Sequence, residues 1–484
     1  MMGFKRGEIV MKCEPFVFAV DEEYGINLAC DFCLISIDKL NLEKLQECSL
    51  CKMVYYCSNS CRENAWNNHH ENECILMQNT IFEGDVPENL IFNHHILRLM
   101  TRIILKLRKN DQKFVELPNG KKRYFSDLIS HKEDIINYPD PYWKKILFEQ
   151  IYAGLQIWFG KHLPPKNDLL EIYGKCSINS LAIRPTGYGL FLDASAMDHS
   201  CIRNAVYVFN GKEVIVKSIE NVSDFKDIRV SYLSNISITL SNTETRRNYL
   251  MECYHFKCEC PRCLDFQLDQ FNSSLICSKC CQGCIPSVMG TCTECNEQVD
   301  SKILEKHAKM KLKINHMLSI QCDMKTLNNL FEECEKIFHP FDEDFAKLIN
   351  ELLFGNNTGD NEDNFELILK LQKLFLRCCE KKCSNYDKQI GVIHLMIGEL
   401  CDILNLFSEA ESHLKKAEDI LSLTCGNDHP ELSRCRKILE NVITRKLLKS
   451  LFELKKKKDD GKISKEDFKD ALKGLSANCQ IFAK

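Results

Sequence analysis

The segment CDFCLISIDKLNLEKLQECSLCKMVYYCSNSCRENAWNNHHENEC, residues 30–74, carries seven cysteines and two adjacent histidines in paired groups. Such a stretch has no core of its own to fold around, so we expect bound metal to hold it. Tetrahedral Zn²⁺ takes four ligands, and a C-x2-C or C-x3-C turn delivers two thiolates to one ion. The segment therefore predicts two zinc sites. Their expected ligands are Cys30, Cys33, Cys48, Cys51, Cys57, Cys61, Cys74 and one of the two histidines.

The order of these ligands favours an interleaved pairing. The first and third cysteine pairs would share one ion, and the second pair would share the other with the histidine and Cys74. The spacing does not prove this pairing. His70 and Cys74 are four residues apart, on one face of a helix, so we prefer His70 to its neighbour His69. A disulfide framework or scattered buried thiols is the alternative, which we disfavour because four paired groups in one short stretch rarely arise otherwise.

The composition is that of an ordinary soluble protein, with 484 residues, 44% hydrophobic and 27% charged. This length allows about two to four domains. The net charge of −4 disfavours a nucleic-acid footprint over the whole molecule, although local basic patches are compatible with it. No secretory segment follows Met1, and no run reaches the roughly 20 apolar residues that span a bilayer. We therefore expect an intracellular protein of the cytoplasm and nucleus, without a membrane partner, whose 29 cysteines are metal ligands and buried thiols.

The pattern changes several times along the chain. Residues 1–29 predict a turn into a strand at KRGEIV, and residues 84–174 carry the helical periodicity of a small insert. Residues 178–233 change to short strands and turns. Within them Asn210 and Gly211, between two alternating apolar runs, predict a β-hairpin. After Asp265 we expect a second cysteine-rich patch and then mostly helices.

The second patch has the pattern C-x2-C…C-x2-C, a strong zinc-ribbon signal. Its expected ligands are Cys277, Cys280, Cys292 and Cys295, for which Cys281 and Cys284 could substitute in part. Further on, the small residues Gly398, Ala410 and Ala417 mark where helices could approach closely. The two helices that contain these small residues resemble a tetratricopeptide repeat, and a plain helical bundle is an equally good alternative. Near the end KKDDGKISKEDF resembles half an EF-hand, with Gly461 and Ile463 in place, but lysines stand at ligand positions, so we expect no calcium site.

Three further segments carry residues suited to chemistry. MDHSCIRN, residues 197–204, is a polar turn before a strand, and VSYL places Tyr232 at the end of another apolar strand. YHFKCECPRC, residues 254–263, supplies three thiolates, and Cys201 in the polar turn is the remote candidate for the fourth ligand that zinc requires. The expected ligands of this site are Cys201, Cys258, Cys260 and Cys263.

The first zinc segment, with Tyr55 and Tyr56 before Cys57 and Trp66 after Cys61, resembles a MYND zinc finger. With DHSC, the strand ending in Tyr232 and the CEC-PRC segment, the chain is similar to the SMYD family of protein-lysine methyltransferases. This resemblance implies an α+β fold, in which a SET β-fold is split by the finger and a helical insert. The implied parts are the start of SET (1–29), the MYND finger (30–74), the helical insert (75–174), the SET core (175–240), the post-SET zinc cluster (241–264), the zinc-ribbon-like segment (265–300) and a tetratricopeptide-like α-helical domain (301–484).

The same resemblance implies an S-adenosylmethionine-dependent methyltransferase that acts on lysines of histone or non-histone proteins, with Tyr232 as the catalytic residue. The residues implied for the cofactor pocket are His131 and Asn179, then Ser195, Asp198 and His199 beneath the methionine portion, and Tyr254 and Phe256 as aromatic walls. Aromatic faces and carbonyl dipoles hold a cationic sulfonium well. The finger implies a second partner, a proline-rich peptide, and we expect a monomer.

Two departures from the family pattern bear on activity. The family's glycine-rich cofactor strand precedes the point where MMGFKRGEIV aligns, so we expect a chain that is truncated at its start or lacks part of the cofactor clamp. Asp198 stands where the family has asparagine, and its carboxylate would oppose the cofactor's carboxylate unless it is neutralised. The alternative function is therefore a zinc-stabilised scaffold without useful catalysis. Tyr232, His199 and the post-SET cysteines favour the enzyme.

Overall fold

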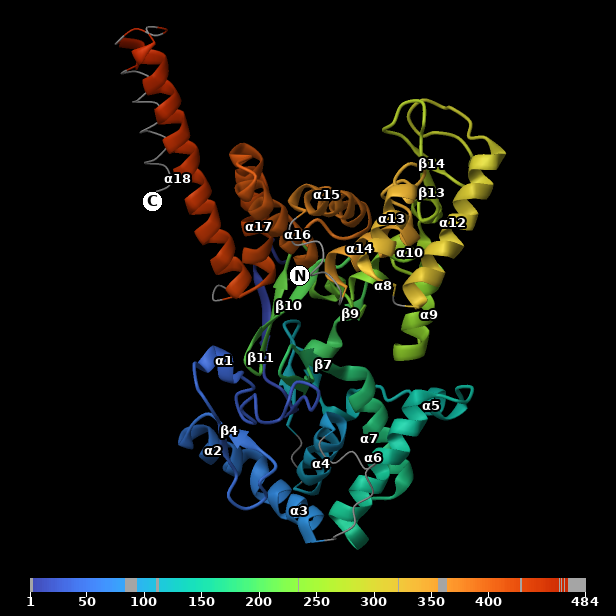
Figure 1. Cartoon of the computed structure of the whole chain (residues 1–484). Helices are drawn as coiled ribbons and strands as arrows, with labels where there is room; N and C mark the ends of the chain where they lie inside the picture. Colours follow the sequence, from blue (N-terminus) through green and yellow to red (C-terminus); the bar gives the residue numbers. More distant parts are fainter. Residues whose placement is uncertain are drawn as a thin grey trace. The chain divides into compact units, whose positions relative to one another are not determined.

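The computed structural model describes residues 3–82, 94–109, 113–233, 235–320, 322–355, 364–426 and 429–460, together with 462, 464 and 466–468. Gly461 and Ile463 of the EF-hand-like segment lie outside these described residues. The chain forms two compact units (Figure 1). The first comprises Met1–Tyr232 and Arg247–Cys260, and the second comprises Leu233–Arg246 and Pro261–Lys484. The finer division into seven parts stays a prediction.

Two three-stranded antiparallel sheets form the β part of the first unit. The strands of one are, in order, β1 (Ile9–Cys13), β11 (Glu213–Ser218) and β10 (Ala205–Asn210), and those of the other are β2 (Val17–Val20), β8 (Gly187–Leu190) and β7 (Ser180–Ile183). Phe18 of β2 and Val216 of β11 are buried in the same apolar core. The hairpin predicted at Asn210 and Gly211 is confirmed, since Asn210 pairs with Glu213 and Gly211 has a φ of 55°, in the left-handed region that glycine favours.

A short parallel pair holds the polar turn beside the strand that leads to Tyr232. Strand β9 (Asp198–His199) pairs with β12 (Arg229–Val230). The side chain of Asn204 stabilises this arrangement through both polar atoms of its amide. Its Oδ1 accepts a hydrogen bond from the backbone N–H of Arg229 at 2.7 Å, and its Nδ2 donates to the carbonyl of Asp227 at 2.8 Å. The turn after β9 and the approach to Tyr232 are therefore held side by side.

The helices of the first unit pack around α4 (His95–Arg108), whose residues from Ile96 to Ile104 are all buried. Its other helices are α1 (Ile37–Leu40), α2 (Asn59–Ala65), α3 (Glu71–Phe82), α5 (Lys132–Asn137), α6 (Trp143–Phe159), α7 (Lys166–Asn179) and, from Arg247 on, α9 (Thr243–Tyr254). Two small hairpins complete it, β3 (Gln46–Glu47) with β4 (Tyr55–Tyr56), and β5 (Val115–Glu116) with β6 (Lys122–Arg123). The apolar residues of α4, α6 and α7 share one core with the zinc-finger segment.

The second unit is helical apart from the hairpin of β13 (Ser274–Ile276) and β14 (Cys284–Pro286). Its helices are α8 (Ile236–Leu240), α10 (Pro261–Leu264), α11 (Phe266–Gln270), α12 (Ser301–Ser319), α13 (Met324–Cys334), α14 (Glu343–Phe354), α15 (Phe365–Lys382), α16 (Lys388–Ile403), α17 (Phe407–Thr424) and α18 (Pro430–Asp459). The predicted close approach of helices is confirmed for α16 and α17, because a Cβ on Gly398 would lie 2.6 Å from the side chain of Leu414. A tetratricopeptide-like array stays a prediction. In the part of the chain that the structure describes, no helix is both long and apolar enough to cross a bilayer.

Two arginines of α4 are buried against two carboxylates of the zinc-finger segment. Arg98 and Arg102 are 3% and 2% exposed, and each contacts both Asp31 and Glu73. Nη1 of Arg98 lies 2.6 Å from Oδ1 of Asp31, and Nη2 of Arg102 lies 2.8 Å from Oε2 of Glu73. Burial alone would raise the pKa of both carboxyls, but the two guanidiniums hold each pKa well below its usual range. The four groups therefore form a balanced set of buried charges, which we call the buried ion network.

Replacing Arg98 by methionine leaves two buried carboxylates with one guanidinium. Removing one partner of a buried ion pair costs about 3–5 kcal/mol, so Arg98→Met should lower the free energy of unfolding of the first unit by this amount. Urea unfolding followed by tryptophan fluorescence measures this unit separately, because Trp66, Trp143 and Trp158 all lie in it.

Glu149→Ala is the matched control. Glu149 pairs with Lys166 at the surface, 2.7 Å apart, and exposed ion pairs contribute about 0–1 kcal/mol. Equal losses for the two variants would contradict the structural role of the buried ion network.

Candidate zinc centres and cofactor site

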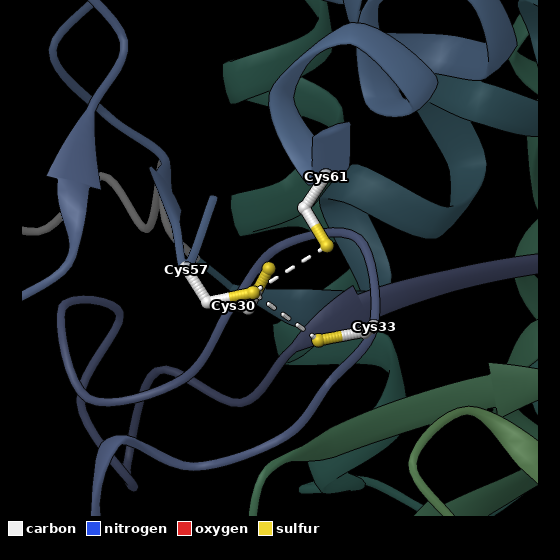
Figure 2. Close-up of side chains that lie close together, drawn as sticks. All are labelled: Cys30, Cys33, Cys57 and Cys61. Carbon is white, nitrogen blue, oxygen red and sulfur yellow. Dashed lines mark hydrogen bonds between the residues drawn. The ribbon is translucent and has the colours of Figure 1, made fainter. Parts of the chain in front are cut away.

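Four cysteines from distant parts of the finger meet in one cluster, with their sulfur atoms turned toward one another (Figure 2). Cys30 and Cys33 precede α1, Cys57 follows β4 and Cys61 lies in α2. The Sγ of Cys57 lies 3.9 Å from that of Cys33 and 3.4 Å from that of Cys61. Two thiolates bound at about 2.3 Å to a tetrahedral zinc ion are about 3.8 Å apart. The four sulfurs therefore fit one Zn²⁺.

A second cluster brings Cys48, Cys51 and Cys74 together with His70. Nε2 of His70 lies 3.4 Å from the Sγ of Cys48 and 3.6 Å from that of Cys51. His69 points elsewhere, with Nε2 3.3 Å from Oδ2 of Asp31. Residues Trp66–His70 form a π-helical turn between α2 and α3, and the two adjacent histidines at its end have different neighbours. The cysteine pairs of the two clusters therefore alternate along the chain, as the interleaved pairing predicts, and His70 lies with Cys48, Cys51 and Cys74.

The two remaining cysteine groups lie beyond the finger. In the first unit Cys201, Cys258 and Cys260 lie together, and the Sγ atoms of Cys201 and Cys258 are 3.9 Å apart. Cys263 belongs to the second unit, whose second segment begins at Pro261, so its role as the fourth ligand stays a prediction. In the ribbon of the second unit, sulfur pairs lie 3.6 and 3.7 Å apart, as one zinc ion requires. The ribbon group is Cys277, Cys280, Cys292 and Cys295, without Cys281 or Cys284.

Tyr232 is held at both ends beside the polar turn. Its backbone N–H donates to Nδ1 of His199 at 2.9 Å, and its hydroxyl donates to the carbonyl of Met197 at 2.5 Å. Nε2 of His199 in turn lies 3.3 Å from the Sγ of Cys201. The position of Tyr232 is therefore fixed by the same turn that carries a zinc ligand.

Two further aromatic rings surround Tyr232. The ring of Tyr254 is 4.9 Å from that of Tyr232, and the ring of Phe256 is 6.2 Å from Tyr232 and 6.0 Å from His199. Burial raises the pKa of Tyr232 to about 12, and Asp198 acts in the same direction, so the phenol is neutral at physiological pH. A group of aromatic faces around a neutral hydroxyl fits a cofactor that carries a sulfonium.

The other predicted pocket residues lie in different settings. Ser195 is in the short helical turn η4 (Ala194–Ala196), and Asp198 is exposed at the start of β9. Nδ1 of His131 lies 2.8 Å from Oδ2 of Asp134. The amide of Asn179 donates to the carbonyls of Ile129 and Lys175. These hydrogen bonds do not link His131 or Asn179 to the group around Tyr232, and their roles stay predictions.

The sequence interpretation missed two residues that reach this turn. Nη2 of Arg123 in β6 donates to the carbonyl of Ser195 at 3.2 Å, and the hydroxyl of Tyr207 in β10 donates to the carbonyl of Ala194 at 3.0 Å. The sequence did contain a local signal for the hairpin that carries Arg123. Asn119 and Gly120 form an NG turn of the kind that joins two strands, and β5 and β6 flank it.

Comparison with known proteins finds a zinc finger and several similar methyltransferases. A family model of the MYND finger matches residues 30–74. Histone-lysine N-methyltransferase ASHR1 of Arabidopsis thaliana is 31% identical over 274 residues, 54% of this chain and 52% of that protein. Histone-lysine N-methyltransferase SMYD3 of Homo sapiens is 28% identical over 53% of this chain and 56% of that protein. N-lysine methyltransferase SMYD2 of Homo sapiens is 21% identical over 454 residues, 91% of this chain and 94% of that protein.

The chain is similar to SMYD proteins along most of its length. It spans about half the length of ASHR1 and SMYD3 and nearly the whole length of SMYD2. The α+β fold, the MYND finger with its zinc and the helical C-terminal region are those expected of a SMYD protein. The MYND finger and the cysteine groups indicate zinc as a cofactor.

Elemental analysis of the purified protein should find about four zinc ions per chain, one for each cysteine group. His70→Ala should remove one of them because it takes away a ligand from the second cluster. His69→Ala should keep the full number, since His69 faces Asp31. A count of two or fewer, or loss of zinc in His69→Ala but not in His70→Ala, would contradict these assignments.

Proposed function

We propose that this chain is an S-adenosylmethionine-dependent protein-lysine N-methyltransferase acting on histone or non-histone proteins. The observation that carries the proposal is the group of aromatic rings around Tyr232, fixed by His199 and Met197. The names of the relatives support the same activity. ASHR1 and SMYD3 are named histone-lysine N-methyltransferases, and SMYD2 is named an N-lysine methyltransferase.

The residues of the turn have distinct roles in this proposal. S-adenosylmethionine, when bound, would supply an electrophilic methyl group to a deprotonated lysine nitrogen, and its sulfonium would leave as a neutral thioether. Ser195, Asp198 and His199 would hold the methionine portion, and Tyr254 and Phe256 would wall the pocket. Because the hydroxyl of Tyr232 donates its hydrogen bond to the carbonyl of Met197, the lone pairs of its oxygen stay available to orient the amine. With a pKa of about 12 Tyr232 acts by orientation and not as a base.

Tyr232→Phe removes the hydroxyl and keeps the ring. Methyl transfer should fall by a factor on the order of 10² or more, while the affinity for S-adenosylmethionine stays nearly unchanged, because the hydroxyl acts in the transition state. A tritiated-methyl assay on histones measures the rate, and calorimetry measures cofactor binding.

Tyr152→Phe is the matched control, since Tyr152 lies on α6, outside the group around Tyr232. Its activity should equal that of the unchanged chain. If Tyr232→Phe retains full activity, or loses cofactor affinity in parallel with activity, the proposed role of the hydroxyl is wrong.

We also propose that the finger binds a proline-rich peptide, which would be a partner separate from the lysine substrate. A MYND finger is a protein-interaction module, and this one presents an apolar side chain on a turn that zinc ligands fix. Leu50, between Cys48 and Cys51, is 53% exposed, and Lys52 beside it is exposed as well. Extended proline-rich segments dock in apolar, often aromatic-lined grooves of interaction modules, and Leu50 would contribute to such a surface. A monomeric state and a cytoplasmic and nuclear location stay predictions.

Leu50→Asp should weaken the binding of a proline-rich peptide by about tenfold or more, the scale of one buried apolar side chain, with the zinc content unchanged. Leu42→Asp, at another exposed leucine of the finger, should leave binding unchanged. Fluorescence anisotropy with a labelled peptide measures both. Peptide binding that survives Leu50→Asp would place the peptide elsewhere.

A further inference from the structure

Arg123 is a half-buried cation beside the turn that the proposed function assigns to the methionine portion of the cofactor. Its Nη2 donates to the carbonyl of Ser195, which is a neutral acceptor. Its Nε is buried and has no hydrogen-bond partner among the described residues. Within the same residues no ion pair of 4.0 Å or less joins Arg123 to a carboxylate. The guanidinium thus keeps donors for a further group.

The acidic side chains near Arg123 have other partners or face solvent. Oδ2 of Asp127 accepts the backbone N–H of Tyr124, and Oδ1 of Asp193 accepts that of Ala194. Asp198 is exposed. Burial lowers the pKa of Arg123, whereas Asp127, Tyr232 and Asp198 act to raise it, so these groups lie close enough to share its field. At physiological pH the negative charges near Arg123 are therefore aspartates, and none of them forms an ion pair with it among the described residues.

A desolvated guanidinium with open donors is unfavourable until an anion meets it. Carboxylate is the anion that a guanidinium binds best in proteins, through two parallel N–H···O bonds. The methionine portion of S-adenosylmethionine carries a carboxylate. We propose that Arg123 receives this carboxylate and offsets the charge of Asp198. The proposal rests on the proposed function and explains how an aspartate is tolerated where the family has asparagine.

The test compares a ligand that carries the carboxylate with one that lacks the whole amino-acid portion. S-adenosylmethionine has the amino-acid portion, and 5′-methylthioadenosine has the adenosine and the thioether without it. Calorimetry on the full zinc-loaded chain measures the affinity for each ligand. Arg123→Gln should lower the affinity for S-adenosylmethionine by about 10- to 100-fold, the scale of a charge-assisted hydrogen bond. The affinity for 5′-methylthioadenosine should change by no more than about threefold.

Two companion variants separate charge from structure. Arg123→Lys keeps the positive charge and should recover part of the lost affinity for S-adenosylmethionine. Asp198→Asn should raise the affinity for S-adenosylmethionine but not that for 5′-methylthioadenosine. The gain should be larger in the Arg123→Gln background, where no guanidinium offsets the charge of Asp198. Thermal melting of each variant reports whether the fold is retained.

Several results would overturn the inference. If Arg123→Gln weakens both ligands equally, Arg123 only positions Ser195. If it leaves the affinity for S-adenosylmethionine unchanged, the carboxylate binds elsewhere. If the unchanged chain binds neither ligand, the proposed function itself fails, which is a different outcome from binding that is insensitive to Arg123.

Discussion

Two guanidiniums and two carboxylates, buried together, connect the zinc finger to the rest of the first unit. Asp31 lies between Cys30 and Cys33, and Glu73 precedes Cys74 and lies 3.5 Å from Nδ1 of His70, so each carboxylate adjoins one zinc cluster. Arg98 and Arg102 bring both carboxylates onto α4, and Arg102 also donates to the carbonyl of Phe18 in β2. Charges buried this deeply are tolerated only as a balanced and hydrogen-bonded set. The finger, α4 and β2 therefore have one arrangement that satisfies all four groups.

This arrangement extends from β2 to the candidate cofactor site. Phe18 pairs with Gly189 of β8, and the chain leaves β8 directly into the turn that carries Ser195, Asp198 and His199. The other end of that turn carries Cys201, a zinc ligand beside His199. The turn is thus held by a sheet on one side and by a cysteine group on the other. Methyl transfer depends on alignment of the reacting atoms more than on a strong base, so a turn held in this way suits the reaction.

The parts that could be predicted from sequence are those with local signals. A C-x2-C turn and an NG hairpin each need only neighbouring residues, and the cysteine groups and the hairpin at Gly211 were accordingly found. His70 could be preferred to His69 because it is four residues from Cys74, but the contact of His69 with Asp31 could not be predicted, since these two residues are 38 apart. In sequence Arg98 and Arg102 look like the exposed face of an amphipathic helix. Their burial depends on Asp31, which is 67 residues from Arg98, and on the placement of the finger. Arg123 was missed for the same reason, because its partner Ser195 is 72 residues away.

Under the proposed function, this fixed turn carries out methyl transfer to lysine. Mass spectrometry tests that claim most directly. The full chain is incubated with histones and S-adenosylmethionine whose transferable methyl group is deuterated, and the histone peptides are sequenced by fragmentation. The account predicts deuterated methyl groups on lysine side chains, made in the presence of the chain and absent from an incubation without it. Histones that remain unlabelled while calorimetry shows the cofactor bound to the same preparation would contradict the claim and leave a zinc-stabilised binding protein.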